Sequence, residues 1–138
     1  MKKYDNFVSC LTVLEQVDFA LTDQYEIVKT GIVGQFNLTF EMTWKLLKQI
    51  MLNDNITDFA HGSPREIIMT AYQFHYLDHL PIWSQMLKDR NLNIHVYDEQ
   101  AFNQLVDKIH HDYIPALVNL KTSLTPIVAR QDTTITTG

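Results

Sequence analysis

The chain has 138 residues, a formal net charge of −5, and only four glycines and four prolines. This length suits one domain with a sizeable core, and the scarcity of glycine and proline favours helices over sheets or loop-rich folds. The negative charge argues against a protein that coats nucleic acid through a broad basic surface, although a local basic site stays open. The single cysteine, Cys10, excludes an internal disulfide framework and a cysteine-based zinc site, and we expect it to be buried packing.

The chain shows no targeting or membrane signal. Its first residues lack the apolar run of a signal peptide, and no stretch is apolar enough to cross a bilayer. We therefore expect a cytoplasmic protein with no membrane partner.

Five stretches carry apolar residues at the three- and four-residue spacings of amphipathic helices. In chain order they cover about residues 4–24, 26–52, 63–76, 80–91 and 98–120. Ser63 and Glu66 form a capping-box pattern around Pro64, and Asp98 can cap the last helix. Pro115 should kink that helix. No alternating pattern is long enough for a sheet. The sequence predicts an all-α fold, an antiparallel up-and-down bundle of about five helices.

The domain organisation follows from where the helical period ends. We expect one helical bundle domain over residues 1–124 and a flexible tail over residues 125–138, where a threonine-rich ending shows no period. The two tryptophans, Trp44 and Trp83, fall on apolar stripes and are expected in the core.

Several standard sites are missing from the sequence. There is no glycine-rich phosphate loop and no strand–turn–helix serine motif. His75 and His79 are four residues apart and could share a helix face as zinc ligands do, but no third ligand has a suitable spacing. His110 and His111 are neighbours that point in different directions, which fits surface positions. We expect neither a metal nor another cofactor.

The most informative stretch is residues 90–97, where Arg90 precedes His95 and Tyr97. Arginine forks onto phosphate oxygens, histidine exchanges protons near neutral pH, and tyrosine offers a hydroxyl that can be modified. On one unbroken helix, residues five apart lie roughly 140° from each other around the axis, so Arg90 and His95 would not converge. Either the helix breaks between them, which Asn91 permits, or a two-fold dimer places the segment beside its copy.

The dimeric arrangement suits RNA cleavage. One imidazole would remove the 2′-hydroxyl proton, the other would protonate the departing 5′-oxygen, and the arginines would stabilise charge on phosphorus. The alternative is a structural helix end, at which Arg90 pairs with Asp89 or Glu99 and His95 bonds to backbone carbonyls. Both interpretations stay open on the residues alone.

Four blocks of sequence carry a family resemblance. They are residues 35–48 (QFNLTFEMTWKLLK), 63–66 (SPRE), 83–89 (WSQMLKD) and 90–99 (RNLNIHVYDE). Together they resemble the nucleotidyltransferase substrate-binding protein family, a branch of the HEPN superfamily that looks like the HepT toxins. The resemblance runs from about Phe7 to Leu120. It implies a helical bundle that dimerises and a minimal nucleotidyltransferase encoded nearby as the partner.

The resemblance also implies roles for particular residues. In the HepT branch the Arg-x4-His pair is a ribonuclease site, and the tyrosine two residues after the histidine receives AMP from the partner. Arg90, His95 and Tyr97 occupy those positions, and Asn91 supports the site. Two residues depart from the family pattern: Asn37 stands where Glu is common, and Met69 where Arg is common.

Two main classes of function remain. The first is a metal-independent endoribonuclease toxin that acts on RNA and is silenced by AMPylation. The second is a non-catalytic subunit that presents substrate to a nucleotidyltransferase. A helical scaffold without chemistry is a third, and a neighbouring nucleotidyltransferase gene would argue against it.

Overall fold

A computed structural model describes residues 1–90 and 98–137, with their side chains up to residue 133. The described residues form helices and no strand. The elements are α1 (Lys2–Glu15), a 3-10 turn η1 (Phe19–Asp23), α2 (Glu26–Asn53), α3 (Pro64–Gln73), α4 (Leu80–Asp89), α5 (Glu99–Lys108), a π-helical turn η3 (Ile109–Tyr113) and α6 (Ile114–Thr137). The predicted all-α helical bundle is confirmed.

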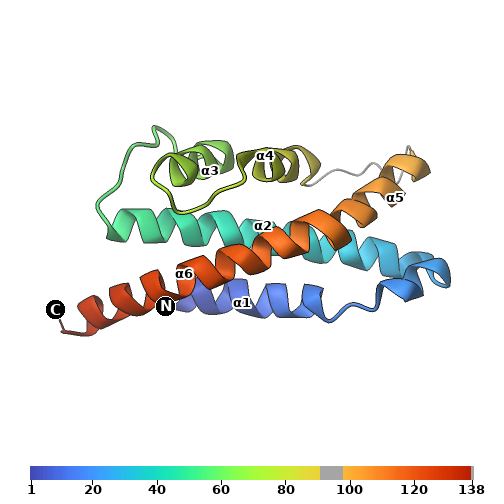
Figure 1. Ribbon diagram of the computed structural model, residues 1–138, viewed down its shortest axis with the longest axis horizontal. Coiled ribbons are helices and arrows are strands. Elements are labelled where there is room, and N and C mark those ends of the chain that lie inside the picture. The colour runs from blue at the N-terminus through green and yellow to red at the C-terminus, as the bar shows by residue number, and fades with distance from the viewer. Residues whose placement is uncertain (91–97, 138) are drawn as a thin grey trace.

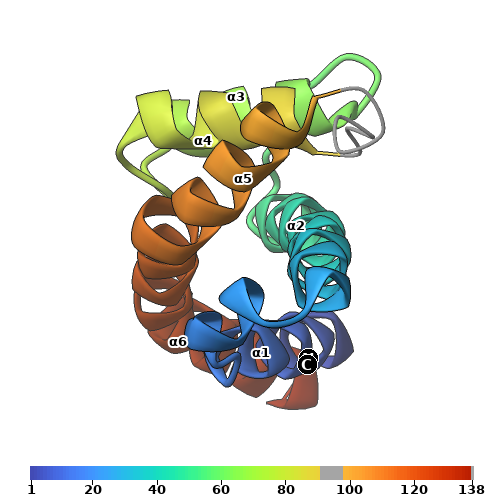
Figure 2. The same cartoon turned by 90° about the vertical axis from the view of Figure 1, so that its right-hand side faces the viewer.

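The described helices run up and down around a common core. Helices α1 and α2 are antiparallel, α3 and α4 follow each other along α2, and α5, η3 and α6 form one continuous rod that returns (Figure 1). Seen along the bundle, α2 and the rod face each other, with α1 on one side and α3 and α4 on the other (Figure 2). The two short helices therefore build one layer, called here the α3–α4 layer.

Helix α2 supplies the largest share of the core because its apolar residues recur at helical spacing. Its fully or almost fully buried hydrophobic side chains are Ile32, Val33, Phe36, Phe40, Leu46, Leu47, Ile50 and Met51. Trp83 of α4 is buried as expected. Trp44 is not a core residue: it is half-buried, and its indole nitrogen donates to Glu41 at 2.9 Å. Among the described helices, none has the length and apolarity to span a membrane.

The first predicted helix is shorter than its apolar spacing indicated. Helix α1 ends at Glu15, and Asp18 then accepts a hydrogen bond from the Ala20 backbone nitrogen to start the separate 3-10 turn η1. A short acidic side chain of this kind competes with helical backbone bonds. The stripe stays buried through Leu14, whereas Leu21 is exposed.

The predicted caps are present. Ser63 accepts from the Glu66 backbone nitrogen, and the Glu66 carboxylate accepts from the Ser63 backbone nitrogen, which completes the capping box. Asp98 accepts from the Ala101 nitrogen and starts α5. These two caps determine the residues at which α3 and α5 begin.

The predicted interruption at Pro115 takes the form of the π-helical turn η3. Proline has no backbone N–H, and its ring crowds the carbonyl four residues earlier. The helix widens just before it: the Ile114 nitrogen donates to the Ile109 oxygen, five residues back. Such turns are one of the identifiable causes of irregular helices.

Helix α6 runs past residue 124, where we expected the domain to end. It reaches Thr137 with Pro126 inside it. Val128 and Gln131 are buried, at the spacing that continues Leu117, Leu120 and Leu124. The buried amide of Gln131 donates to the Ile50 carbonyl at 3.0 Å and accepts from Asn53 at 3.1 Å. Residues 125–133 are therefore part of the bundle, held partly by polar contacts that an apolar period does not reveal.

We expect Gln131→Ala to lower the free energy of unfolding by about 1–3 kcal/mol, because it removes two hydrogen bonds, one to the Ile50 carbonyl and one from the Asn53 amide. Chemical denaturation followed by circular dichroism measures the loss. The matched control is Gln104→Ala, at an exposed position of α5. Equal stability of the two variants would contradict a structural role for the last turns of α6.

Candidate site at the end of helix α4

Arg90 lies at the point where the chain leaves α4. It is half-buried, its backbone is extended (φ −64°, ψ 144°), and its backbone nitrogen closes the last turn on the Met86 oxygen. The other predicted site residues, Asn91, His95 and Tyr97, lie outside the described residues. Because α4 ends at Asp89, the angle between residues five apart on an unbroken helix does not apply at Arg90.

The residue before Arg90 is held by a hydrogen bond across the bundle. Asp89 is buried at the last position of α4, and the Tyr113 hydroxyl donates to its Oδ2 atom. The Lys108 ammonium lies 3.6 Å from the same oxygen. A buried carboxylate requires partners of this kind, because an unpaired one is costly. This Asp89–Tyr113 contact fixes the end of α4, and with it the backbone position from which the Arg90 side chain extends.

Tyr113 reaches Asp89 from the π-helical turn η3. Its ring stacks on Phe36 of α2, with 5.1 Å between the ring centroids, and almost none of its surface is exposed. Burial, followed by the hydrogen bond to Asp89, raises the pKa of the Tyr113 hydroxyl above its ordinary value. The hydroxyl therefore stays protonated and remains a donor to Asp89 throughout the physiological pH range.

This arrangement bears on the alternative interpretation of Arg90 as a structural ion-pair partner. Among the residues that the structure describes, neither Asp89 nor Glu99 forms an ion pair with Arg90. Asp89 is instead bound to Tyr113 and Lys108. The two acidic neighbours named from the sequence therefore do not neutralise the guanidinium.

A hollow of about 300 Å³ lies next to this network, one helical turn before Asp89. Lys108, Asp112 and Tyr113 line it from the rod, and Gln85 lines it from α4. Lys108 therefore contributes to two places at once, the hollow and the Asp89 carboxylate. It adds a cation from the rod close to the end of α4, a feature that sequence reasoning missed because residues 89 and 108 are far apart in the chain.

The family model for nucleotidyltransferase substrate-binding-protein-like chains matches residues 2–126. The chain belongs to this family. The match covers α1 to the first half of α6, including all four sequence blocks that carried the resemblance. No curated protein matches the sequence.

The remaining histidines of this family member form no metal site among the described residues. His75 and His79 flank the turn between α3 and α4 in left-handed conformations, at φ 67° and φ 56°, so they do not share a helix face. His110 is exposed and stacks on Phe19, with centroids 3.9 Å apart. The four-residue spacing that suggested zinc therefore has no structural counterpart.

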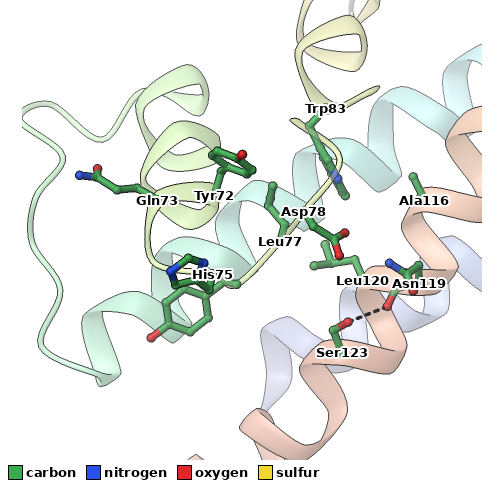
Figure 3. Close-up of a pocket in the computed structure, with 11 residues that line it drawn as sticks. Tyr72, Gln73, His75, Leu77, Asp78, Trp83, Ala116, Asn119, Leu120 and Ser123 are labelled. Carbon is green, nitrogen blue, oxygen red and sulfur yellow. Dashed lines mark hydrogen bonds between the residues drawn. The ribbon is translucent and has the colours of Figure 1, made fainter. Parts of the chain in front are cut away.

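A second and larger hollow of about 480 Å³ separates the α3–α4 turn from α6 (Figure 3). Its walls come from residues 72–83 and 116–123. Sequence reasoning missed it, because its residues are of ordinary types and meet only when the rod folds back along the α3–α4 layer. Trp83, which lines it, lies seven residues before Arg90, or about 10 Å along α4.

The contact between Tyr113 and Asp89 should be worth more than a second tyrosine–aspartate bond in this protein. Tyr76 donates to Asp54 at 2.6 Å, but Asp54 also accepts two hydrogen bonds from Arg130, at 3.1 and 3.2 Å, and is less buried than Asp89, whose second partner, Lys108, lies at 3.6 Å. We expect Tyr113→Phe to cost about 1–3 kcal/mol of unfolding free energy and Tyr76→Phe to cost less. Urea unfolding curves of the two variants measure the difference. A Tyr113→Phe protein as stable as the wild type would show that the contact does not anchor α4.

Proposed function

We propose that this protein is a HepT-like component of a two-gene module with a minimal nucleotidyltransferase, and that it acts as a metal-independent endoribonuclease silenced by AMPylation. Family membership supports the nucleotidyltransferase partner. The position of Arg90 supports the chemistry. It is a permanent cation on extended backbone beside a fixed helix end, and it has no ion pair with the nearby acids Asp89 and Glu99. The proposal includes the HEPN character of the fold, a homodimer and a cytoplasmic location.

The proposed reaction uses two copies of the segment related by a two-fold axis. His95 of one subunit takes the proton from an RNA 2′-hydroxyl, whose oxygen then attacks phosphorus. The bond from phosphorus to the 5′-oxygen breaks, and the partner subunit's His95 protonates that leaving oxygen. The products are a 2′,3′-cyclic phosphate and a free 5′-hydroxyl. Arg90, supported by Asn91, stabilises the charge that develops on the phosphoryl oxygens.

A second function, as a non-catalytic subunit that binds substrate for the nucleotidyltransferase, is favoured by one observation. The larger hollow between the α3–α4 turn and α6 has a volume in the range of small-molecule sites. In this alternative, Arg90 would contact the partner or its nucleotide instead of RNA. The two functions are separated by whether the purified protein cleaves RNA.

We expect His95→Ala to reduce RNA cleavage by about 10²–10⁴-fold, the usual cost of losing a general acid or base. Arg90→Ala should reduce it by about 10²–10³-fold through lost charge stabilisation. Cleavage of a fluorescent RNA measures both effects, and sedimentation of the same samples checks the dimer on which the mechanism depends.

The matched controls for that experiment are His61→Ala and Arg65→Ala, which alter exposed side chains at the start of α3 and should leave cleavage unchanged. If the wild type cuts no RNA and its overexpression is harmless to cells, the endoribonuclease proposal fails and the binding subunit takes its place. A monomer at micromolar concentration would contradict the two-fold mechanism.

Tyr97 is the proposed point of control. Its hydroxyl oxygen would attack the α-phosphate of ATP on the partner enzyme and release pyrophosphate, which leaves AMP in phosphodiester linkage to the ring. The added phosphate would occupy the donors of Arg90 and block RNA.

We expect the wild type to gain one AMP mass per modified chain after incubation with the nucleotidyltransferase and ATP, and Tyr97→Phe to gain none. Peptide mapping by mass spectrometry locates the addition, with Tyr25→Phe, at an exposed tyrosine just before α2, as the control. Unchanged modification of Tyr97→Phe would remove Tyr97 from the mechanism.

A further inference from the structure

The larger hollow has an apolar base and a polar rim. Leu77, Trp83 and Leu120 are buried in its base. Asp78, Asn119 and Ser123 stand at its rim (Figure 3). A mixed lining of this kind, with a few polar groups converging over apolar side chains, is typical of small-molecule sites.

The turn between α3 and α4 gives the hollow its shape. His75 and His79, at the two ends of this turn, both adopt left-handed backbone conformations that non-glycine residues rarely take. Between them, Leu77 points into the bundle and Asp78 extends toward the face of α6 that carries Asn119 and Leu120 (Figure 3). Tyr76 fixes the turn to the end of α2, because its hydroxyl donates to Asp54.

The charges of the lining limit the ligand. Among the described residues that line the hollow, Asp78 carries the one carboxylate, and none is a lysine or an arginine. The Asp78 side chain is 72% exposed, and the His79 imidazole lies 3.7 Å from its Oδ1 atom, so the carboxylate stays accessible. An anion such as a nucleotide phosphate would meet this carboxylate and neither lysine nor arginine among the described lining residues. A ligand that carries a positive charge would instead be attracted by the Asp78 carboxylate.

The aromatic residues point the same way. Tyr72 and Tyr76 contribute to the walls, and Trp83 contributes to the base. Aromatic faces attract organic cations, and apolar rings pack on leucine side chains. Asn119 and Ser123 can exchange hydrogen bonds with hydroxyl or amine groups of a ligand.

We propose that this hollow is a binding site for a small organic cation, a ring-bearing amine whose ammonium group pairs with Asp78 and whose ring packs on Leu77, Trp83 and Leu120. The site is separate from Arg90, and the proposal holds whether or not the protein cleaves RNA. The proposal requires that cationic ligands bind more tightly than neutral or anionic ones, and that this preference depends on the Asp78 carboxylate.

Three probes with the same phenol ring and different charges test the proposal: tyramine as the cation, 4-ethylphenol as the neutral compound and 3-(4-hydroxyphenyl)propionate as the anion. Amide chemical shifts of the full chain, followed by NMR during titration, locate and quantify binding. We expect tyramine to shift the amides of Leu77, Asn119 and Ser123. It should bind about fivefold more tightly than 4-ethylphenol, the scale of one exposed ion pair.

Two variants and one control make the result decisive. Asp78→Asn should bring tyramine down to the affinity of 4-ethylphenol, whereas Asp58→Asn, in the loop before α3, should change nothing. Ala116→Leu fills the hollow from α6 and should abolish binding of both compounds. Absence of shifts at millimolar tyramine, tighter binding of the anion, or equal tyramine affinity of Asp78→Asn and the wild type would overturn the proposal.

Discussion

The missing backbone N–H of Pro115 is the constraint from which the end of helix α4 takes its position. The rod formed by α5, η3 and α6 widens into a π-helical turn just before this proline. Tyr113, the last residue of the turn, is buried against Phe36 and donates to Asp89. Asp89 is the last residue of α4. The turn before Pro115 therefore positions Tyr113, whose hydrogen bond to Asp89 positions the backbone of Arg90.

A similar contact holds the α3–α4 layer at its middle. Tyr76, in the turn between the two short helices, donates to Asp54 at the end of α2, and Arg130 of α6 binds the same carboxylate. The layer is thus fixed to the long helices at two points, each by a tyrosine hydroxyl and an aspartate. Burial, then the bond to Asp54, raises the pKa of Tyr76 to about 12, so this contact also keeps its proton at neutral pH.

Much of the fold could be predicted from the sequence because it depends on local rules. The apolar period of α2, the capping box at Ser63 and the cap at Asp98 each act within a few residues, and each is present in the structure. The first helix and the last turns of α6 were less predictable. Asp18 starts a separate 3-10 turn before the apolar spacing of the first helix runs out, and Gln131 is buried within a threonine-rich stretch in which the sequence shows no apolar period.

The candidate sites divide in the same way. Arg90 was identified from its residue type and its place after an amphipathic helix, which are local signals. The Asp89–Tyr113 contact, the role of Lys108 and the larger hollow join residues more than eighteen positions apart, so no spacing rule reveals them. Asn91, His95 and Tyr97 lie outside the described residues, and their roles rest on family membership and chemistry.

The shortness of α3 and α4 has a consequence for how the protein moves. Each has ten residues, below the length at which an isolated helix persists in water, so both are held by packing on α2 and the rod. Local opening should begin in such a layer, where backbone amides exchange with solvent before those of the long helices. Both candidate sites border this layer. A molecule bound at either site would stabilise the packing of α3 and α4 on the long helices and slow the hydrogen exchange of their amides. Binding at one end of the layer would thereby lower the cost of ordering the site at the other end.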